Sequence, residues 1–257
     1  MISSSQIKLI RSLSQKKFRD KNQLYIIEGE KLVKELAGGK AGHDHRIKLL
    51  FATGDWIGQN QTELARSGIE AVEAGLSDIK RVSNLVTPPQ VLALVNIPNP
   101  QFNEDELADT PVLAFESIRD PGNLGTIIRT ADWFGIGHII CTPDSVDVYN
   151  PKVVQSTMGA IARVDVIYKD ILQILNRPGI KKKAVYGTFL DGENIYETTL
   201  DKNPMILFGN ESHGLSDRFD PYIRQRLSIP SFSTNGAGSE SLNVASSVAV
   251  ICSEIRR

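Results

Sequence analysis

Five residues in three short stretches have side chains that could do chemistry at a shared site. They are Asn123 and Arg129 in "NLGTIIRTA", Glu211 in "GNESHGLS", and Ser241 and Asn243 in "SLNVASSVA". A carboxylate such as Glu211 can hold an arginine in a bidentate pair. Arg129 lies in an otherwise apolar helical pattern, so its guanidinium must reach a cleft, an anion or a partner chain. The alternatives are an arginine lying over apolar surface and an Asn123 that only caps its helix.

A loop rich in Gly and Ser, residues 231–240, comes directly before an apolar helix expected over 241–256. Such loops offer unpaired main-chain N–H and C=O groups. These groups can bind the edge of a heterocycle, and a helix N-terminus adds positive potential. Gly209, at the end of a strand, allows a ligand to approach the backbone closely. The pattern predicts a main-chain cradle for a ligand; the alternative is a merely flexible connection.

Strand and helix patterns alternate over residues 111–257, and the three stretches each follow an expected strand. Alternation of this kind predicts an α/β domain with a mostly parallel sheet covered on both faces. Ligands of such sheets bind beyond the carboxyl ends of the strands. The expected strands lie within 110–118, 138–143, 163–168, 183–189, 203–211 and 226–230, and the expected helices within 123–135, 150–161, 169–179, 215–223 and 241–256.

The first 97 residues have the pattern of a smaller α/β domain, beginning with a helix over 3–19. Residues 98–110 are rich in proline and acids and are expected to form a linker. Residues 1–100 carry a formal charge of +4 and the remainder −5. The first 21 residues hold six Lys or Arg and one acid, Asp20. This clustering suits a polyanion such as RNA, although a solvated helix face would have the same composition.

Several classes of protein are disfavoured. No apolar run approaches the ~20 residues of a membrane span, and the N-terminus lacks the apolar core of a signal peptide. Cys141 and Cys252 form neither a disulfide framework nor a metal cluster, so inert buried thiols in a reducing cytoplasm are expected. The phosphate-binding, dinucleotide-binding and zinc-protease motifs are absent, and Glu211 stands where a nucleophile elbow has serine.

Together and in this order, "NLGTIIRTA", "GNESHGLS" and "IP…ESLNVASSVA" resemble the motifs of the SpoU (TrmH-type) RNA ribose 2′-O-methyltransferases of the SPOUT superfamily. The resemblance covers about residues 111–257. It implies a catalytic domain with a trefoil knot that binds S-adenosylmethionine (AdoMet), acts as a homodimer and needs no metal. Residues 1–97 resemble the RNA-binding extension of the family. The loop between Ile229 and Ser241 is longer than the shortest versions in the family.

The resemblance also implies which residues act. It assigns the reaction to Asn123, Arg129, Glu211, Ser241 and Asn243, and the cofactor cradle to Gly209, Ile229 and Leu242, with Thr188, Leu207 and Phe208 nearby. Arg129 is expected to stabilise the 2′-alkoxide, because arginine hardly ever loses its proton. A phosphate, Glu211 or water then takes the proton, and Asn123 and Glu211 orient the guanidinium.

The resemblance favours ribosomal RNA as the substrate, because minimal tRNA enzymes of the family often lack such an N-terminal domain. The alternatives are a tRNA ribose methyltransferase, an enzyme that confers antibiotic resistance by methylating rRNA, and a non-catalytic RNA-binding assembly factor. The sequence does not name the methylated nucleotide.

Overall fold

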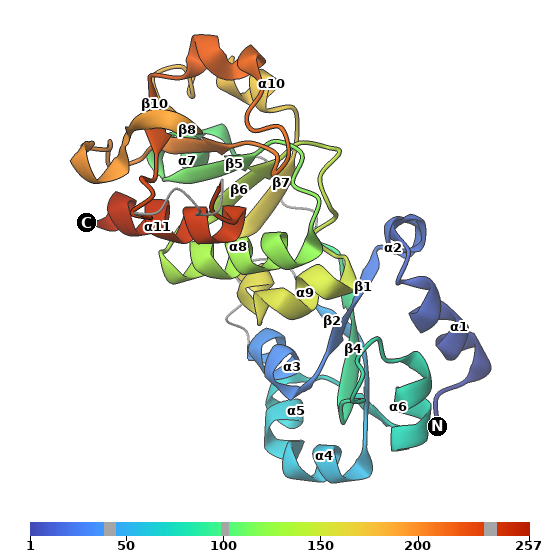
Figure 1. Ribbon diagram of the computed structural model, residues 1–257. Helices are drawn as coiled ribbons and strands as arrows, with labels where there is room; N and C mark the ends of the chain where they lie inside the picture. The colour runs from blue at the N-terminus through green and yellow to red at the C-terminus, as the bar shows by residue number, and fades with distance from the viewer. Residues whose placement is uncertain (39–44, 99–102, 234–240) are drawn as a thin grey trace. The chain divides into compact units, whose positions relative to one another are not determined.

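The computed structural model describes residues 1–38, 45–98, 103–233 and 241–257. Main-chain contacts divide the chain into two units. Unit 1 comprises Met1–Pro100 and Asp147–Arg163, and unit 2 comprises Gln101–Val146 and Val164–Arg257. Each unit is built on its own β-sheet (Figure 1). Within the described ranges, no helix is both long and apolar enough to cross a bilayer.

Unit 2 contains a six-stranded sheet in the order β10-β8-β9-β5-β6-β7, and all neighbouring strands are parallel. The predicted parallel α/β sheet and its six strands are therefore confirmed. The strands are β5 (Val112–Phe115), β6 (His138–Cys141), β7 (Asp165–Tyr168), β8 (Val185–Asn194), β9 (Met205–Phe208) and β10 (Gln225–Ser228). The helices are α7 (Glu104–Asp109), α8 (Pro121–Trp133), α10 (Ile171–Leu175) and α11 (Val244–Arg256), with 3-10 turns η2 (Ile195–Glu197) and η3 (Asp217–Tyr222).

The centre of this sheet is apolar on both faces, because helices cover both sides of a parallel sheet. All residues of β5 and β9 are buried. Phe115 and Phe208 end these neighbouring strands and stack with their ring centroids 4.9 Å apart. On one side α8 and α11 pack against each other (Figure 1). Arg256 of α11 donates hydrogen bonds to the carbonyls of Phe134 and Gly135, just past the end of α8.

Unit 1 contains a four-stranded sheet in the order β1-β4-β2-β3, in which β4 is antiparallel to both neighbours and β2 is parallel to β3. Its strands are β1 (Leu24–Glu28), β2 (Ile47–Ala52), β3 (Ala71–Glu73) and β4 (Val91–Asn96). Its helices are α1 (Ser4–Ser12), α2 (Lys16–Asn22), α3 (Glu30–Ala37), α4 (Gly54–Gln59), α5 (Gln61–Ser67), α6 (Leu76–Val82) and α9 (Pro151–Thr157), with a 3-10 turn η1 (Ala160–Ala162).

One expectation for local structure is wrong. The single helix expected over 3–19 is two helices, because Ser12 and Ser14 hydrogen-bond back to main-chain carbonyls and Gln15 is extended. The expected linker over 98–110 stays a prediction, and within it residues Glu104–Asp109 form the short helix α7. Asn103 caps this helix, and the negative charges of the acids in its first turn stabilise the helix by interacting with the positive end of its dipole.

The segment 147–163 follows β6 in the chain but packs in unit 1, where α9 lies against β1. The Arg19 guanidinium donates to the Asp147 carboxylate over 2.5 and 2.9 Å and to the carbonyls of Leu13 and Ser14. Arg19 is only 2% exposed. These partners are 128 residues apart, which explains why periodicity gives no sign of the contact. The domain boundaries inferred from the sequence remain a prediction.

Replacing Asp147 by alanine should lower the free energy of unfolding by about 3 kcal/mol, since it leaves the buried Arg19 charge without a counter-ion. The exposed i,i+4 pair Lys16–Asp20 provides the control, and Asp20→Ala should cost less than about 1 kcal/mol. Urea unfolding of the full chain measures both. Equal stability of the two variants would contradict a structural role for the buried pair.

Candidate functional site

The turn after β9 is closed so tightly that only glycine fits at its start. A Cβ at Gly209 would lie 2.0 Å from the carbonyl carbon of Gly214 and 2.1 Å from the Leu215 nitrogen. The main chains of Asn210 and Gly214 exchange two hydrogen bonds of 2.9 Å. The Asn210 amide donates to the carbonyl of Ser117, just after β5, over 2.9 Å. The ends of β5 and β9 are thus fixed to each other.

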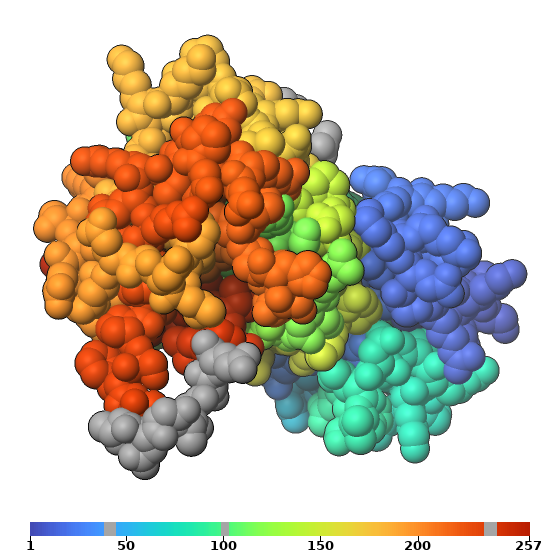
Figure 2. Space-filling model, turned by 45° about the horizontal axis from the view of Figure 1, so that its top comes forward, coloured from blue at the N-terminus to red at the C-terminus, as the bar shows by residue number. Residues whose placement is uncertain are grey.

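Side chains from three distant stretches meet beside this turn. Asn123 donates from Nδ2 to Oε1 of Glu211 over 2.8 Å, and its Oδ1 accepts from Nδ2 of Asn243 over 3.1 Å. The surfaces near the start of α8 (green) and the turn after β9 (orange) lie side by side in Figure 2. The prediction that these stretches converge at the strand ends is therefore confirmed for Asn123, Glu211 and Asn243.

Two expected helix starts are shifted, and the shifts explain how this network forms. Asp120 caps α8 by accepting from the Asn123 N–H over 2.8 Å. Asn123 is therefore the third helical residue rather than the cap, and its amide is available for Glu211 and Asn243. Conversely, Asn243 is the cap of α11, accepting from the N–H groups of Ala245 and Ser246; the helix begins at 244 rather than at 241.

Arg129 and Ser241 do not join the network. Each α-helical residue turns about 100°, so Arg129, six residues after Asn123, leaves α8 from a different side. Both Arg129 and Ser241 are exposed and make no hydrogen bond or ion pair with the described residues. Within the described part of one chain, Asn123 and Glu211 hydrogen-bond to each other and make no hydrogen bond or ion pair with the guanidinium, so their expected role in orienting it stays a prediction. Trp133, one turn after Arg129, shares its face of the helix and is 84% exposed.

The residues expected to form the cofactor cradle lie within β8, at the ends of β9 and β10 and just before α11. Thr188 donates to the carbonyl of Leu207 over 3.1 Å, and Leu207 and Phe208 are buried. Ile229 directly follows β10 and is half-buried. Among the described residues, the main-chain N–H groups of Gly209 and Leu242 have no acceptor. Most of the loop, residues 234–240, lies outside the described residues.

A second cluster at the ends of β5 and β6 was not identified from the sequence. Ser117 has a left-handed backbone (φ 55°) and donates from its hydroxyl to Asp144 over 2.5 Å. Thr142 donates to the same carboxylate over 2.6 Å. These two hydrogen bonds lower the pKa of Asp144, with a further contribution from the charge of Arg119. The available signal was that Ser117 and Thr142 each follow a buried strand.

Glu116 was also missed, and it ties β5 to the segment after the turn. Its carboxylate accepts from the N–H and the hydroxyl of Ser216, each over 2.8 Å. It also forms an ion pair with Arg218, with 2.8 Å between Nη2 and Oε1. The main chain around Gly209 is therefore held from both sides, which favours a preformed binding surface.

The described residues contain no group of three His, Cys, Asp or Glu side chains able to hold a metal ion. The two cysteines are unpaired and buried, as expected. Burial raises the pKa of Cys252 to about 12 and that of Cys141 further still. Neither thiol is therefore activated as a nucleophile.

Comparisons with known proteins agree with this geometry. Residues 110–253 match the profile of the SpoU rRNA Methylase family, and residues 4–93 match an MRM3-like substrate binding domain. The chain is 26% identical over 258 residues to the 23S rRNA (guanosine(2553)-2'-O)-methyltransferase RlmP of Bacillus subtilis, covering 98% of this chain and 96% of RlmP.

Two solved structures extend the likeness to the whole fold. One is a protein of Porphyromonas gingivalis described under the TrmH family of RNA methyltransferases, with a TM-score of 0.83 and 37% identity over 99% of this chain and 98% of that one. The other is the AdoMet-bound rRNA methyltransferase of Sinorhizobium meliloti, with a TM-score of 0.80 and 26% identity over 100% of this chain and 96% of that one. With its sheet, its converging strand ends and its family profile in agreement, the chain belongs to the SpoU family of RNA methylases.

Proposed function

We propose that this protein transfers a methyl group from AdoMet to a ribose 2′-hydroxyl of ribosomal RNA. The observation that carries the proposal is the junction of Asn123, Glu211 and Asn243 beside the turn that begins at Gly209. The likeness to RlmP, which is named for this reaction on 23S rRNA, supports the choice of substrate. The match of residues 4–93 to a substrate binding domain favours rRNA over tRNA.

The strand ends fit AdoMet because they offer neutral main-chain donors. The N–H groups of Gly209 and Leu242 are without acceptors among the described residues and can bind the polar edge of an adenine. Ile229 and the main chain of Leu207 and Phe208 complete the proposed cradle, with Thr188 fixing the carbonyl of Leu207. AdoMet, when bound, supplies a methyl group that its sulfonium has already activated, so the proposed reaction needs no metal.

Arg129 is the proposed electrostatic catalyst. A guanidinium about 4 Å from the ribose oxygen favours the alkoxide by roughly 4 kcal/mol at an effective dielectric constant near 20. This corresponds to about three units of pKa for the 2′-hydroxyl. Glu211, an RNA phosphate or water accepts the proton. Ser241 and Asn243 hold the ribose or the start of α11.

We further propose that two copies of the chain form a homodimer in the cytoplasm. Arg129 and Trp133 lie one turn apart on the exposed face of α8, and a tryptophan that is 84% exposed is typical of an interface anchor. The buried free cysteines suit a reducing compartment.

The family resemblance supports a C-terminal trefoil knot, and β9 lies between the earlier strands β8 and β5. Residues 1–97 are the proposed RNA-binding domain, joined by 98–110 to a catalytic domain over 111–257.

Incubating the purified full chain with AdoMet and either unmodified 23S rRNA or bulk tRNA tests the proposed function. One 2′-O-methylated nucleoside should appear in the digested rRNA by mass spectrometry, and should be missing from rRNA of a deletion strain. Methylation of tRNA alone would establish the runner-up substrate. Failure to bind AdoMet in calorimetry would instead favour a non-catalytic assembly factor.

A further inference from the structure

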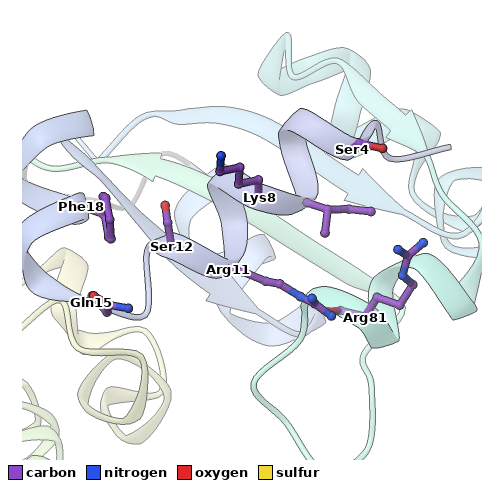
Figure 3. Close-up of a pocket in the computed structure, with 8 residues that line it drawn as sticks. Ser4, Lys8, Arg11, Ser12, Gln15, Phe18 and Arg81 are labelled. Carbon is purple, nitrogen blue, oxygen red and sulfur yellow. The ribbon is translucent and has the colours of Figure 1, made fainter.

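A groove of about 490 Å³ runs along the first two helices of unit 1. It is lined by Ser4, Ile7, Lys8, Arg11, Ser12, Gln15, Phe18 and Arg81. Figure 3 shows Ser4, Lys8 and Ser12 along α1, with Arg81 across the groove on α6. The blue surface of the first helices lies beside the teal surface of α6 in Figure 2. The elements of this groove all belong to one unit of the chain.

The lining combines three cations with hydroxyl and amide groups and contains no carboxylate. Lys8, Arg11 and Arg81 are exposed. Asp78 approaches Arg81 at 3.9 Å, which is too long for a strong hydrogen bond. Asp20, the acid of the basic N-terminal segment, is already paired with Lys16 at 2.8 Å. The cationic field of the groove is therefore largely uncompensated.

Arg11 fixes the two walls of the groove relative to each other. Its Nε donates to the main-chain carbonyl of Arg81 over 2.8 Å, so α1 is tied to the end of α6. The terminal nitrogens of Arg11 have no partner among the described residues. A preformed site loses less conformational freedom when a ligand binds.

The polar groups of the groove are spaced along a line. Ser4, Lys8 and Ser12 follow one another at intervals of four residues, which places them on one face of α1. At 1.5 Å per residue this row extends over about 12 Å. Gln15 continues the row toward α2. The ring of Phe18 lines the end of the groove on this side, and Lys17 Nζ lies 4.8 Å from the centroid of that ring. An extended polyanion matches a row of this length better than a single small anion does.

We infer that this groove binds the sugar–phosphate backbone of the RNA substrate. The inference rests on the proposed function and names a surface through which the substrate is held. Lys8, Arg11 and Arg81 pair with phosphates, and the hydroxyl and amide groups donate hydrogen bonds to phosphate oxygens and donate to or accept from ribose hydroxyls. Such contacts position an RNA without reading its sequence. Two of the six basic residues of the first 21, Lys8 and Arg11, line the groove.

The salt dependence of binding tests the groove. Unmodified 23S rRNA is titrated with the full chain in the absence of AdoMet. The double variant Lys8→Gln/Arg81→Gln should bind about tenfold more weakly, and the slope of log K against log salt concentration should fall by about 1.4 to 1.8, because two phosphate contacts are lost. The affinity for AdoMet and the thermal midpoint should not change. In the methylation assay the KM for RNA should rise while kcat is kept.

A matched control separates local contacts from net charge. Lys48→Gln/Arg66→Gln removes the same charge from exposed positions of unit 1 outside the groove and should leave the affinity and slope unchanged. Equal losses in both double variants, or no loss in the groove variant, would overturn the inference; the latter would leave an acidic protein surface as the candidate occupant. Binding is measured without AdoMet and therefore without turnover. A wild-type chain that binds rRNA but transfers no methyl group would refute the proposed function, and the binding data would still test whether the groove holds the RNA.

Discussion

Arg129→Ala should slow methyl transfer about 1000-fold, because losing roughly 4 kcal/mol of alkoxide stabilisation raises the barrier by that amount. The affinity for AdoMet should stay within about twofold, since Arg129 is exposed on α8 and outside the junction of Asn123, Glu211 and Asn243. Single-turnover methylation of rRNA and calorimetry with AdoMet measure the two quantities. Equal losses of transfer and AdoMet affinity would contradict this division of roles.

Two further variants sharpen the test. Arg224, another exposed arginine of unit 2, pairs with Asp201 at 2.7 Å, and Arg224→Ala should transfer methyl groups at the wild-type rate. Arg129→Lys keeps the charge but not the planar fork, so it should recover part of the rate.

Mixing subunits shows whose site Arg129 serves. If the proposed homodimer forms and Arg129 acts on the partner's site, exchange of Arg129→Ala with Gly209→Ala chains, assayed at an AdoMet concentration too low to load Gly209→Ala, should restore about a quarter of the wild-type activity. Half of the dimers are then mixed, and each mixed dimer has one intact composite site. If Arg129 acts within its own chain, mixing restores nothing.

The sequence was sufficient for the fold where periodicity and burial coincide. The strands β5 and β9 read as short apolar runs because both of their faces are covered, and the helices between the strands carry apolar residues at helical spacing. What periodicity misses is decided by single polar groups. Ser12 and Ser14 divide the first helix, Asn103 starts α7, and the buried pair Arg19–Asp147 brings a distant segment into unit 1.

Of the five candidate residues, three could be predicted to lie together, but the geometry of their contacts could not be. Placing the motifs at strand ends was enough to bring Asn123, Glu211 and Asn243 together. Asp120 caps α8 and so leaves the Asn123 side chain available to reach Glu211 and Asn243. The sequence pattern did not predict this, because a cap is set by one hydrogen bond. The cluster of Ser117 and Asp144 escaped notice because it needs a left-handed φ at a non-glycine residue.

Gly209→Ala should weaken AdoMet binding by roughly 30-fold, because the turn must open and break its two main-chain hydrogen bonds, each worth about 1 kcal/mol. The atoms that a Cβ would strike, 2.0 and 2.1 Å away, belong to the main chain of Gly214 and Leu215 and cannot rotate aside. Gly58 provides the control: it lies in α4 with nothing within 4 Å of its added Cβ, so Gly58→Ala should be neutral or slightly stabilising.

Asn210→Ala keeps this prediction testable if Gly209→Ala does not fold. It inserts no atoms; it removes the donor to the Ser117 carbonyl and the acceptor for the Ser212 N–H. The turn then remains closed by main-chain bonds but is no longer fixed to the end of β5, so AdoMet affinity should fall by about tenfold with a small change in the thermal midpoint. Calorimetry and thermal unfolding measure the two effects. If folded Gly209→Ala and Asn210→Ala proteins both bound AdoMet with wild-type affinity, the cofactor would have to bind elsewhere. A site made of main-chain atoms loses affinity when the turn that positions those atoms moves.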